Sequence, residues 1–240
     1  MTQPTDKTAI RNAATVIALR DRFSAPKVLM GQRGAKAAFM PNKFVFPGGA
    51  LDQDDFDVPL AEGFHPTCAA RLTEGCPRDI SAALGVAAVR ELWEETGLIL
   101  GAKGDWRGAV PEDWDDFAKA GYLPSARPLQ FVFRAITPMG RPRRFDARFF
   151  LVDADDIASD LDDFSRAEDE LSHLQWIPLN EVRSFDLPFI TEVVLAEVAH
   201  RAHTTEPPQN VPFFHNGAEE SLFLRLGGRG PLTGKQIADS

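Results

Sequence analysis

Three glutamates lie close together in a stretch whose composition favours a helix. Glu91, Glu94 and Glu95 occupy positions i, i+3 and i+4, so a helix would place their carboxylates on one face. Like charges this close repel one another unless a cation offsets them, and carboxylate oxygens are ligands that Mg²⁺ and Mn²⁺ prefer. The spacing therefore predicts a divalent metal site, and the alternative interpretation is a solvated helix face.

The elements that would position these glutamates can also be predicted. Residues 82–96 are rich in Ala, Leu and Glu, and Gly97 follows directly as a C-terminal stop. Apolar side chains recur there at three- and four-residue spacing, which predicts one buried face. Arg90 precedes Glu94 by four residues, so we expect it to pair with Glu94 and fix its orientation.

A proline and two glycines precede this helix in the chain. Pro47-Gly48-Gly49 forms a sharp turn with little side-chain bulk, which gives a ligand or a metal close access to the backbone. We expect Gly48 and Gly49 to lie at the substrate, with the carbonyl of one of them as a further metal ligand. Residues 52–81 then form a long irregular stretch, which is unusual inside a compact domain and is often functional.

The order of these features resembles the Nudix box, whose pattern is G-x5-E-x7-R-E-U-x-E-E-x-G-U, with U an aliphatic residue. Residues 90–98, R-E-L-W-E-E-T-G-L, match its second half at every fixed position. Counting from Gly49, Asp55 stands where the box has Glu, and 34 residues follow where seven are expected. The chain thus resembles a Nudix hydrolase with an interrupted box, and no catalytic role is carried over to Asp55.

Further segments resemble the subgroup named after nucleoside diphosphate-linked moiety X motif 19, which is associated with coenzyme A (CoA) and acyl-CoA cleavage. These segments are residues 39–52, 136–138 and 144–150. The resemblance covers about residues 10–200. It implies an α/β fold, namely a Nudix α/β/α sandwich with a mixed β-sheet and an insertion inside the box. It also implies hydrolysis of a phosphoanhydride with Mg²⁺ or Mn²⁺ as cofactor.

Within that resemblance, Glu91, Glu94 and Glu95 are the expected metal ligands, and Arg90 orients Glu94 without touching substrate. The general base stays open between a glutamate of the helix and an acidic residue of a distant loop. Three consecutive acidic residues lie just before a predicted strand and are candidates by position, with ordinary surface charge as the alternative. They are Glu168, Asp169 and Glu170.

Phosphate ligands are expected among the arginines, because a guanidinium grips phosphate with two hydrogen bonds. Arg33 and Arg144 are the main candidates and Arg148 is a third; for each, a structural ion pair is the alternative. The insert, residues 56–81, mixes aromatic, apolar and charged side chains. We expect it to contact the substrate or a second subunit of a homodimer; the alternative is a packed decoration.

Alternating strand-like and helix-like segments favour an α/β layered domain. We predict a Nudix domain over residues 8–205, followed by a C-terminal hairpin and tail over residues 206–240 that pack on it. The expected strands are residues 13–20, 28–32, 131–137, 147–152, 174–177, 211–214 and 221–226. The further expected helices are residues 111–122 and 189–202, with another beginning at residues 178–182.

Composition limits the kinds of partner. The net charge is −9, which argues against nonspecific nucleic-acid binding, because a basic face supplies most of that affinity. The first seven residues are polar and no apolar run is long enough to cross a bilayer, so we expect a cytoplasmic protein with no membrane contact. Cys68 and Cys76 fit no common zinc pattern and are expected to be reduced.

Three functions compete for this sequence. The first is cleavage of CoA or a related small-molecule nucleotide diphosphate, although the CoA motif seen upstream of the box in other CoA-cleaving Nudix enzymes is not evident. The second is cleavage of ADP-ribose or NADH. The third is a non-enzymatic Nudix ligand sensor, which the intact Glu91, Glu94 and Glu95 argue against.

Overall fold

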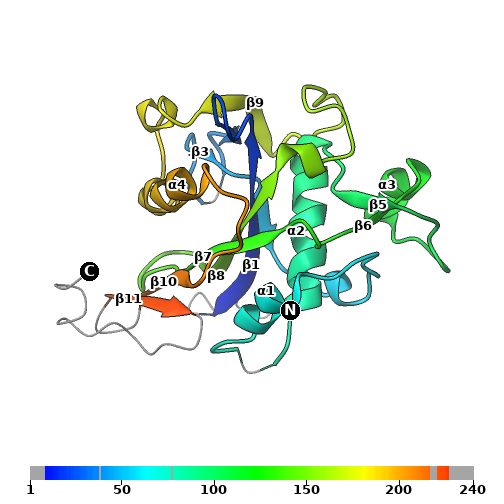
Figure 1. The fold of residues 1–240 in the computed structure, drawn as a ribbon, viewed down its shortest axis with the longest axis horizontal. Coiled ribbons are helices and arrows are strands. Elements are labelled where there is room, and N and C mark those ends of the chain that lie inside the picture. The colour runs from blue at the N-terminus through cyan, green and yellow to red at the C-terminus, as the bar shows by residue number, and fades with distance from the viewer. Residues whose placement is uncertain (1–8, 38, 77, 217–220, 227–240) are drawn as a thin grey trace.

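A mixed β-sheet of nine strands forms the centre of the molecule (Figure 1). The computed structural model describes residues 9–37, 39–76, 78–216 and 221–226. The strand order is β11-β10-β7-β8-β1-β2-β3; β4 pairs with β1 and β9 with β2. The β1–β8 and β7–β10 pairs are parallel and the others are antiparallel. The strands are β1 (Ile10–Arg20), β2 (Lys27–Arg33), β3 (Phe44–Val45), β4 (Gly48–Ala50), β7 (Gln130–Ile136), β8 (Arg144–Asp153), β9 (Leu171–Pro178), β10 (Val211–Asn216) and β11 (Ser221–Leu226).

Helices cover both faces of this sheet. Figure 1 shows α2 (Ser81–Thr96) on one side of the sheet and α4 (Phe189–Arg201) on the other. The shorter α1 (Pro66–Leu72) lies near the end of β1, and α3 (Asp115–Lys119) lies beside a two-stranded sheet of β5 (Gly101–Lys103) and β6 (Tyr122–Pro124). The predicted α/β/α sandwich with a mixed sheet is confirmed.

Alternation along the central strands explains why the sheet is covered twice. In β1, Ala14, Val16 and Ala18 pack into the core on the α2 side. Ile17 and Leu19, at the intervening positions, pack into the core on the α4 side. Successive side chains of a strand point to opposite faces, so a strand that is apolar at every position must be buried on both.

The expected helices agree with the structure unevenly. Residues 189–202 are confirmed as α4. Residues 111–122 were predicted as one helix, but they form a 3₁₀ turn (Glu112–Trp114), the short α3 and the start of β6. Gly121, with φ of 81°, ends α3 before the predicted end of the helix. The helix expected from residues 178–182 is absent: Pro178 ends β9, and a single 3₁₀ turn (Val182–Ser184) follows.

The insert inside the box is an ordered part of the core. It contains α1, and a 3₁₀ turn (Asp54–Phe56) leads into it, within the stretch 52–81 that the sequence predicted to be irregular. Phe64 stacks on Phe150 of β8 with ring centroids 5.1 Å apart, and the side chain of Leu72 is buried in the α2-side core. Arg134 of β7 donates a hydrogen bond of 2.8 Å to the Glu74 carbonyl oxygen. The insert is therefore packed against the sheet from the α2 side.

Three further features bear on the predictions. The expected C-terminal hairpin is present as β10 and β11, and it extends the sheet through β7; its turn lies outside the described residues. Cys68 and Cys76 are free thiols, as expected. Within the described residues, no helix has both the length and the apolar composition needed to cross a membrane.

Candidate active site

The predicted glutamate-bearing helix is confirmed as α2. Asp79 Oδ1 accepts a hydrogen bond of 2.8 Å from the Ser81 backbone N–H, which satisfies a donor that the first turn cannot satisfy within the helix. Gly97 ends the helix with φ of 74°, and its N–H donates to the Trp93 carbonyl oxygen. Most of the last three turns is buried, so the acidic positions point into a site inside the fold and the solvated-face alternative is wrong.

Arg90 is the hub of the acidic cluster. Its Nε and Nη2 atoms form a two-pronged ion pair with Asp55, at 2.9 and 3.1 Å. Its Nη1 atom donates to Glu91 at 2.9 Å and to Glu94 at 3.0 Å, as the i, i+4 spacing of the latter pair predicted. Its Nη2 atom also donates to the Ala50 carbonyl oxygen at 3.1 Å. One guanidinium thus links the helix, the 3₁₀ turn and β4.

Burial disfavours the ionised form of all three glutamates. Burial raises the pKa of Glu91 to about 7, although Arg90 acts in the opposite direction. Burial also raises the pKa of Glu94. The pKa of Glu95 is raised well above its usual value, first by burial and then by the charge of Glu91, while the Gly48 N–H opposes the shift. A bound cation would remove this penalty, because it favours the charged form of each carboxyl group.

The two glycines of β4 let the carboxylates of α2 approach the sheet. The Gly48 N–H donates a hydrogen bond of 2.7 Å to Glu95 Oε2. A Cβ atom on Gly49 would lie 2.5 Å from Cδ of Glu91, so the side chain of Glu91 occupies the space that the missing methyl group leaves. Gly48 and Gly49 pair with Thr15 and Ala14 of β1, which fixes their position in the sheet.

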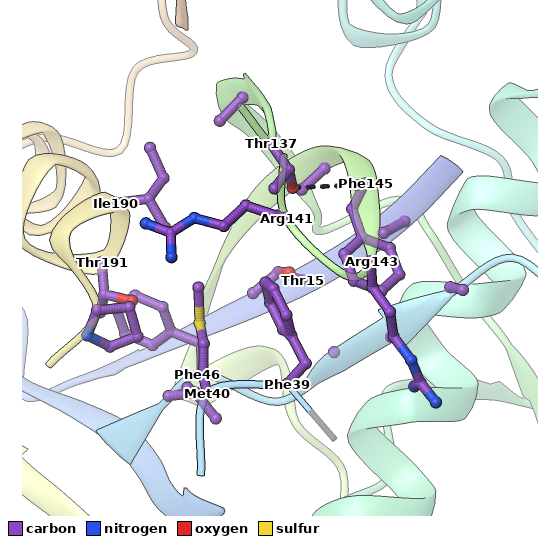
Figure 2. A pocket seen from close by; sticks show the side chains of 18 of the residues that line it. Thr15, Phe39, Met40, Phe46, Thr137, Arg141, Arg143, Phe145, Ile190 and Thr191 are labelled. Atoms are coloured by element: carbon purple, nitrogen blue, oxygen red, sulfur yellow. Dashed lines mark hydrogen bonds between the residues drawn. The ribbon is translucent and has the colours of Figure 1, made fainter. Parts of the chain in front are cut away.

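A cavity of about 900 Å³ opens on the α4 side of the sheet. It lies within the range of small-molecule sites, and Figure 2 shows its central part. Glu91, Gly48 and Gly49 are among the lining residues, so the cavity reaches the acidic cluster. Its apolar lining includes Phe39, Met40, Val45, Phe46, Ile136, Phe145, Phe149, Leu187, Phe189, Ile190 and Phe214. Its basic lining is Arg11, Arg33, Lys43, Arg141 and Arg143, and its acidic lining is Asp52, Glu91 and Glu170.

The loop before β9 closes the site on one side. Glu170 lines the cavity and pairs with Arg33, with Glu170 Oε1 at 2.7 Å from Arg33 Nη2. The Glu168 N–H donates a hydrogen bond of 2.8 Å to the Glu94 carbonyl oxygen and so ties the loop to α2. Of the three acidic residues that the sequence placed here, Glu170 alone is among the residues that line the cavity.

The donor set fits a hard divalent cation in its chemistry. Glu95 Oε1 is buried and has no hydrogen-bond partner, which leaves a carboxylate oxygen available beside Gly48. Within the described residues, no three acidic, histidine or cysteine side chains converge closely enough to hold an ion as they stand. Glu91 and Glu94 are instead turned towards Arg90.

Comparison with known proteins places the chain. No family model matches the sequence. Putative nudix hydrolase 7 of Caenorhabditis elegans is 32% identical, over 71% of this chain and 52% of its own length. A NUDIX hydrolase from Alicyclobacillus acidocaldarius superposes with a TM-score of 0.60 at 29% identity, over 82% of this chain and 97% of its own. The chain belongs to the Nudix hydrolase family. Acyl-coenzyme A diphosphatase NUDT19 of Gallus gallus is 27% identical, over 52% of this chain and 47% of its own length.

The chain spans about half the length of the curated Nudix relatives that it matches. Their activities are therefore a starting point for a proposal about this chain. The structural relative, in contrast, is covered almost completely, which supports treating the described residues as a Nudix fold.

The structure brings together most of the residues predicted from the Nudix box. Arg90, Glu91, Glu94, Glu95, Gly48 and Gly49 form one connected cluster, and Arg33 lines the cavity beside it. The two other arginines point elsewhere. Arg144 is buried and donates to the Thr137 carbonyl oxygen at 3.1 Å, and it is not among the cavity-lining residues. Arg148 is buried against Asp146 and Asn12.

Two sets of residues at this Nudix site were not predicted. Asp55, to which the sequence gave no role, is the buried partner of Arg90; its position in the interrupted box was the available signal. Arg141 and Arg143 line the cavity in place of Arg144. None of the described residues of the insert is among those that line this cavity, and the expectation that the insert contacts the substrate or a second subunit stays a prediction.

Proposed function

We propose that the chain is a magnesium- or manganese-dependent diphosphatase that cleaves the phosphoanhydride of a nucleoside diphosphate-linked compound such as CoA or acyl-CoA. The main observation behind the proposal is that the acidic cluster of α2 lies at the edge of a large cavity, next to Gly48 and Gly49 of β4. The match to an acyl-coenzyme A diphosphatase and the apolar lining of the cavity favour a substrate with an apolar portion.

In this proposal Glu91, Glu94 and Glu95 hold the cation, and a backbone carbonyl of Gly48 or Gly49 is a further candidate ligand. A divalent cation bound there would neutralise phosphate charge and lower the pKa of an attacking water. Arg90 is a positioning residue, because its guanidinium already joins Asp55, Glu91 and Glu94.

Arg33 is the proposed phosphate ligand beside the cluster. Its guanidinium is held by Glu170, and its Nε atom is buried without a hydrogen-bond partner. A phosphate oxygen could satisfy that donor and compete with Glu170 for the guanidinium. Glu170 would then be free to accept the proton of the attacking water, so we assign it as the general base.

Glu170→Gln is expected to lower kcat by about 10²–10³-fold with little change in KM, because general-base catalysis contributes roughly that factor. Glu168→Gln is the matched control, since its side chain does not line the cavity, and it should retain activity. Steady-state kinetics between pH 5 and 9 check this; wild-type kcat in Glu170→Gln would refute the assignment.

A substrate panel tests the function itself. The purified protein would be incubated with Mg²⁺ or Mn²⁺ and CoA, acyl-CoAs, ADP-ribose, NADH or dinucleoside polyphosphates, and product release would be measured by chromatography. We expect turnover of CoA-type compounds. Turnover of ADP-ribose or NADH alone would move the substrate to the second class. Binding without turnover of any compound would make the chain a ligand sensor and refute the diphosphatase.

A further inference from the structure

The turn between β7 and β8 is held firmly at its base and carries charge at its tip. The Thr137 N–H donates to the Phe145 carbonyl oxygen at 2.9 Å, and the Phe145 N–H donates to Thr137 Oγ1 at 3.0 Å (Figure 2). Arg144 adds its bond to the Thr137 carbonyl oxygen at 3.1 Å. Arg141 and Arg143 are exposed beyond this base. The base of the turn is therefore fixed by hydrogen bonds, and Arg141 and Arg143 extend from its exposed tip.

Side-chain alternation decides which arginines of this turn face the cavity. Arg143, Phe145, Ala147 and Phe149 all line it, at every second position. Arg144 lies at the intervening position and is buried away from it. Successive residues of a strand point to opposite faces. Arg143, which directly precedes β8, therefore has the same parity as Phe145 and Phe149, which line the cavity.

Arg141 and Arg143 differ from the other basic residues of the cavity in having no counterion. Arg33 pairs with Glu170, Arg11 with Asp52 and Lys43 with Asp186. Within the described part of the chain, neither Arg141 nor Arg143 has a hydrogen-bond, ion-pair or ring partner. Five basic side chains face three acidic ones in the lining of a protein whose net charge is −9. The excess positive charge is thus local to this wall.

The two guanidiniums also point in different directions. Figure 2 shows Arg141 extending towards Ile190 of α4, while Arg143 extends to the opposite side of the turn. The acidic cluster lies on α2, which covers the other face of the sheet from α4. A diphosphate bound at α2 and at Arg33 would leave at least Arg141 without an anion.

We propose that Arg141 forms a second anion subsite, supported by the unpaired charge of Arg143 on the same turn, which binds a phosphate monoester that the substrate carries apart from its anhydride. This inference rests on the proposed function and narrows it to nucleoside diphosphate derivatives with an additional phosphate. The 3′-phosphate of a CoA-type nucleotide and the 2′-phosphate of an NADPH-type nucleotide share this chemistry. Arginine suits a phosphate dianion, because its planar guanidinium binds the phosphate oxygens with charge-assisted hydrogen bonds.

Binding of product-like nucleotides tests the subsite without catalysis. We would titrate adenosine 3′,5′-bisphosphate, adenosine 2′,5′-bisphosphate and AMP into the protein by calorimetry, at low and moderate salt. One bisphosphate is expected to bind at least ~10-fold more tightly than AMP, and which of the two does so identifies the 3′ or 2′ source. The advantage should shrink with salt, because exposed charges are screened.

Two double variants test whether Arg141 and Arg143 cause the tighter binding of the bisphosphate. Arg141→Gln/Arg143→Gln should bring the bisphosphate-to-AMP affinity ratio close to one and leave AMP affinity within about two-fold. The control Arg107→Gln/Arg127→Gln removes two exposed arginines outside the cavity lining, so it matches the loss of net charge and should keep the ratio. A ratio that the cavity variant preserves, or that is already near one in the wild type, overturns the subsite.

Kinetics separate this inference from the proposed function. The wild type should cleave CoA with a kcat/KM at least ~10-fold above that for dephospho-CoA, or NADPH above NADH, and the double variant should lose the preference mainly through KM. Equal cleavage of both members of each pair would refute the subsite while upholding the diphosphatase. Tighter bisphosphate binding that depends on the arginines, without cleavage of any substrate, would uphold the subsite and refute the diphosphatase.

Discussion

Glu95→Gln is expected to lower kcat at least ~10²-fold and, at the same time, to stabilise the metal-free protein at neutral pH. The activity falls because the variant loses a proposed metal ligand. The fold should persist because a glutamine oxygen can still accept the Gly48 N–H bond that Glu95 Oε2 accepts at 2.7 Å. The stability rises because the variant removes a buried carboxylate whose ionisation the fold opposes.

The pH dependence of this stabilisation has a definite sign. The pKa of Glu95 is raised on folding, so the folded protein holds a proton that the unfolded chain has already lost above its ordinary pKa of about 4.3. The wild-type protein therefore loses stability as pH rises above that value, and Glu91, with a pKa of about 7, adds a loss of the same sign between these values. Glu95→Gln lacks the loss of stability caused by Glu95, so its stability relative to the wild type should increase with pH.

Thermal unfolding between pH 4.5 and 8, with and without Mg²⁺, measures this directly. We expect little difference between the proteins near pH 4.5 and a melting temperature roughly 2–4 °C higher for Glu95→Gln near pH 8, which corresponds to about 1 kcal/mol. Mg²⁺ should raise the wild-type value and leave the variant nearly unchanged. Glu206→Gln is an exposed control that should do neither. A variant that is active, or destabilised at pH 8, would contradict the assignment of Glu95.

Alanine substitutions at the two glycines of β4 are expected to have different effects, one on activity and the other on stability. Gly49→Ala puts a methyl group against the end of the Glu91 side chain, which can swing away. The fold should tolerate this change, but kcat should fall by roughly 10²-fold, because the displaced carboxylate no longer faces the cation. Gly48→Ala puts the methyl group 2.6 Å from Thr15 Cα and equally close to the Ala14 carbonyl oxygen. Backbone cannot move so easily, so the protein should be destabilised by about 2–4 kcal/mol.

Denaturant unfolding and kinetics of both variants, with Gly63→Ala as a control, separate the two outcomes. A Cβ on Gly63 would meet no atom within 4 Å, so that variant should be close to wild type in both measurements. If Gly49→Ala kept full activity, the Glu91 carboxylate could not depend on the space beside Gly49. If Gly48→Ala were as stable as the wild type, the close approach of β4 to β1 would not be the reason for that glycine.

The helix that carries the glutamates could be predicted from sequence because its signals are local. Composition, apolar spacing and Gly97 fix the limits of a helix within a few residues, and the i, i+3, i+4 positions follow from helical geometry alone. The pairing of Arg90 with Glu94 is local in the same sense. The role of Asp55 is not, because it depends on how residues 35 positions apart in the chain meet in the fold.

Arg144 lies in a segment that lines the cavity, but its own side chain does not line it. The sequence placed a phosphate ligand in the basic turn before β8, and that turn does line the cavity. The prediction chose Arg144 and, with less weight, Arg148, which share one parity along the strand and are buried on the side away from the cavity. The aromatic residues Phe145 and Phe149 share the parity of Arg143, so alternation was an available signal.

The insert was not predictable for a different reason. Its composition predicted an irregular stretch, with a packed decoration as one alternative for its role, but tertiary contacts determine its structure. Leu72 and Phe64 are buried against α2 and β8, and Arg134 anchors the Glu74 carbonyl oxygen. Those partners lie far from it in the sequence. Local composition therefore predicted an irregular stretch where the structure forms α1 and packs it into the core.

The proposed reactive groups and the proposed substrate-binding wall are attached to two separately packed cores of this fold. The helix with the glutamates is rooted in the core on the α2 side, whereas Phe46, Phe149 and Leu187 of the cavity wall belong to the core on the α4 side. The two meet at Gly48 and Gly49. Under the proposed function, we therefore expect substitutions in the wall to change the preferred substrate without disturbing the packing behind the glutamates. The same arrangement makes the wall the practical starting point for redesigning this protein towards new diphosphates.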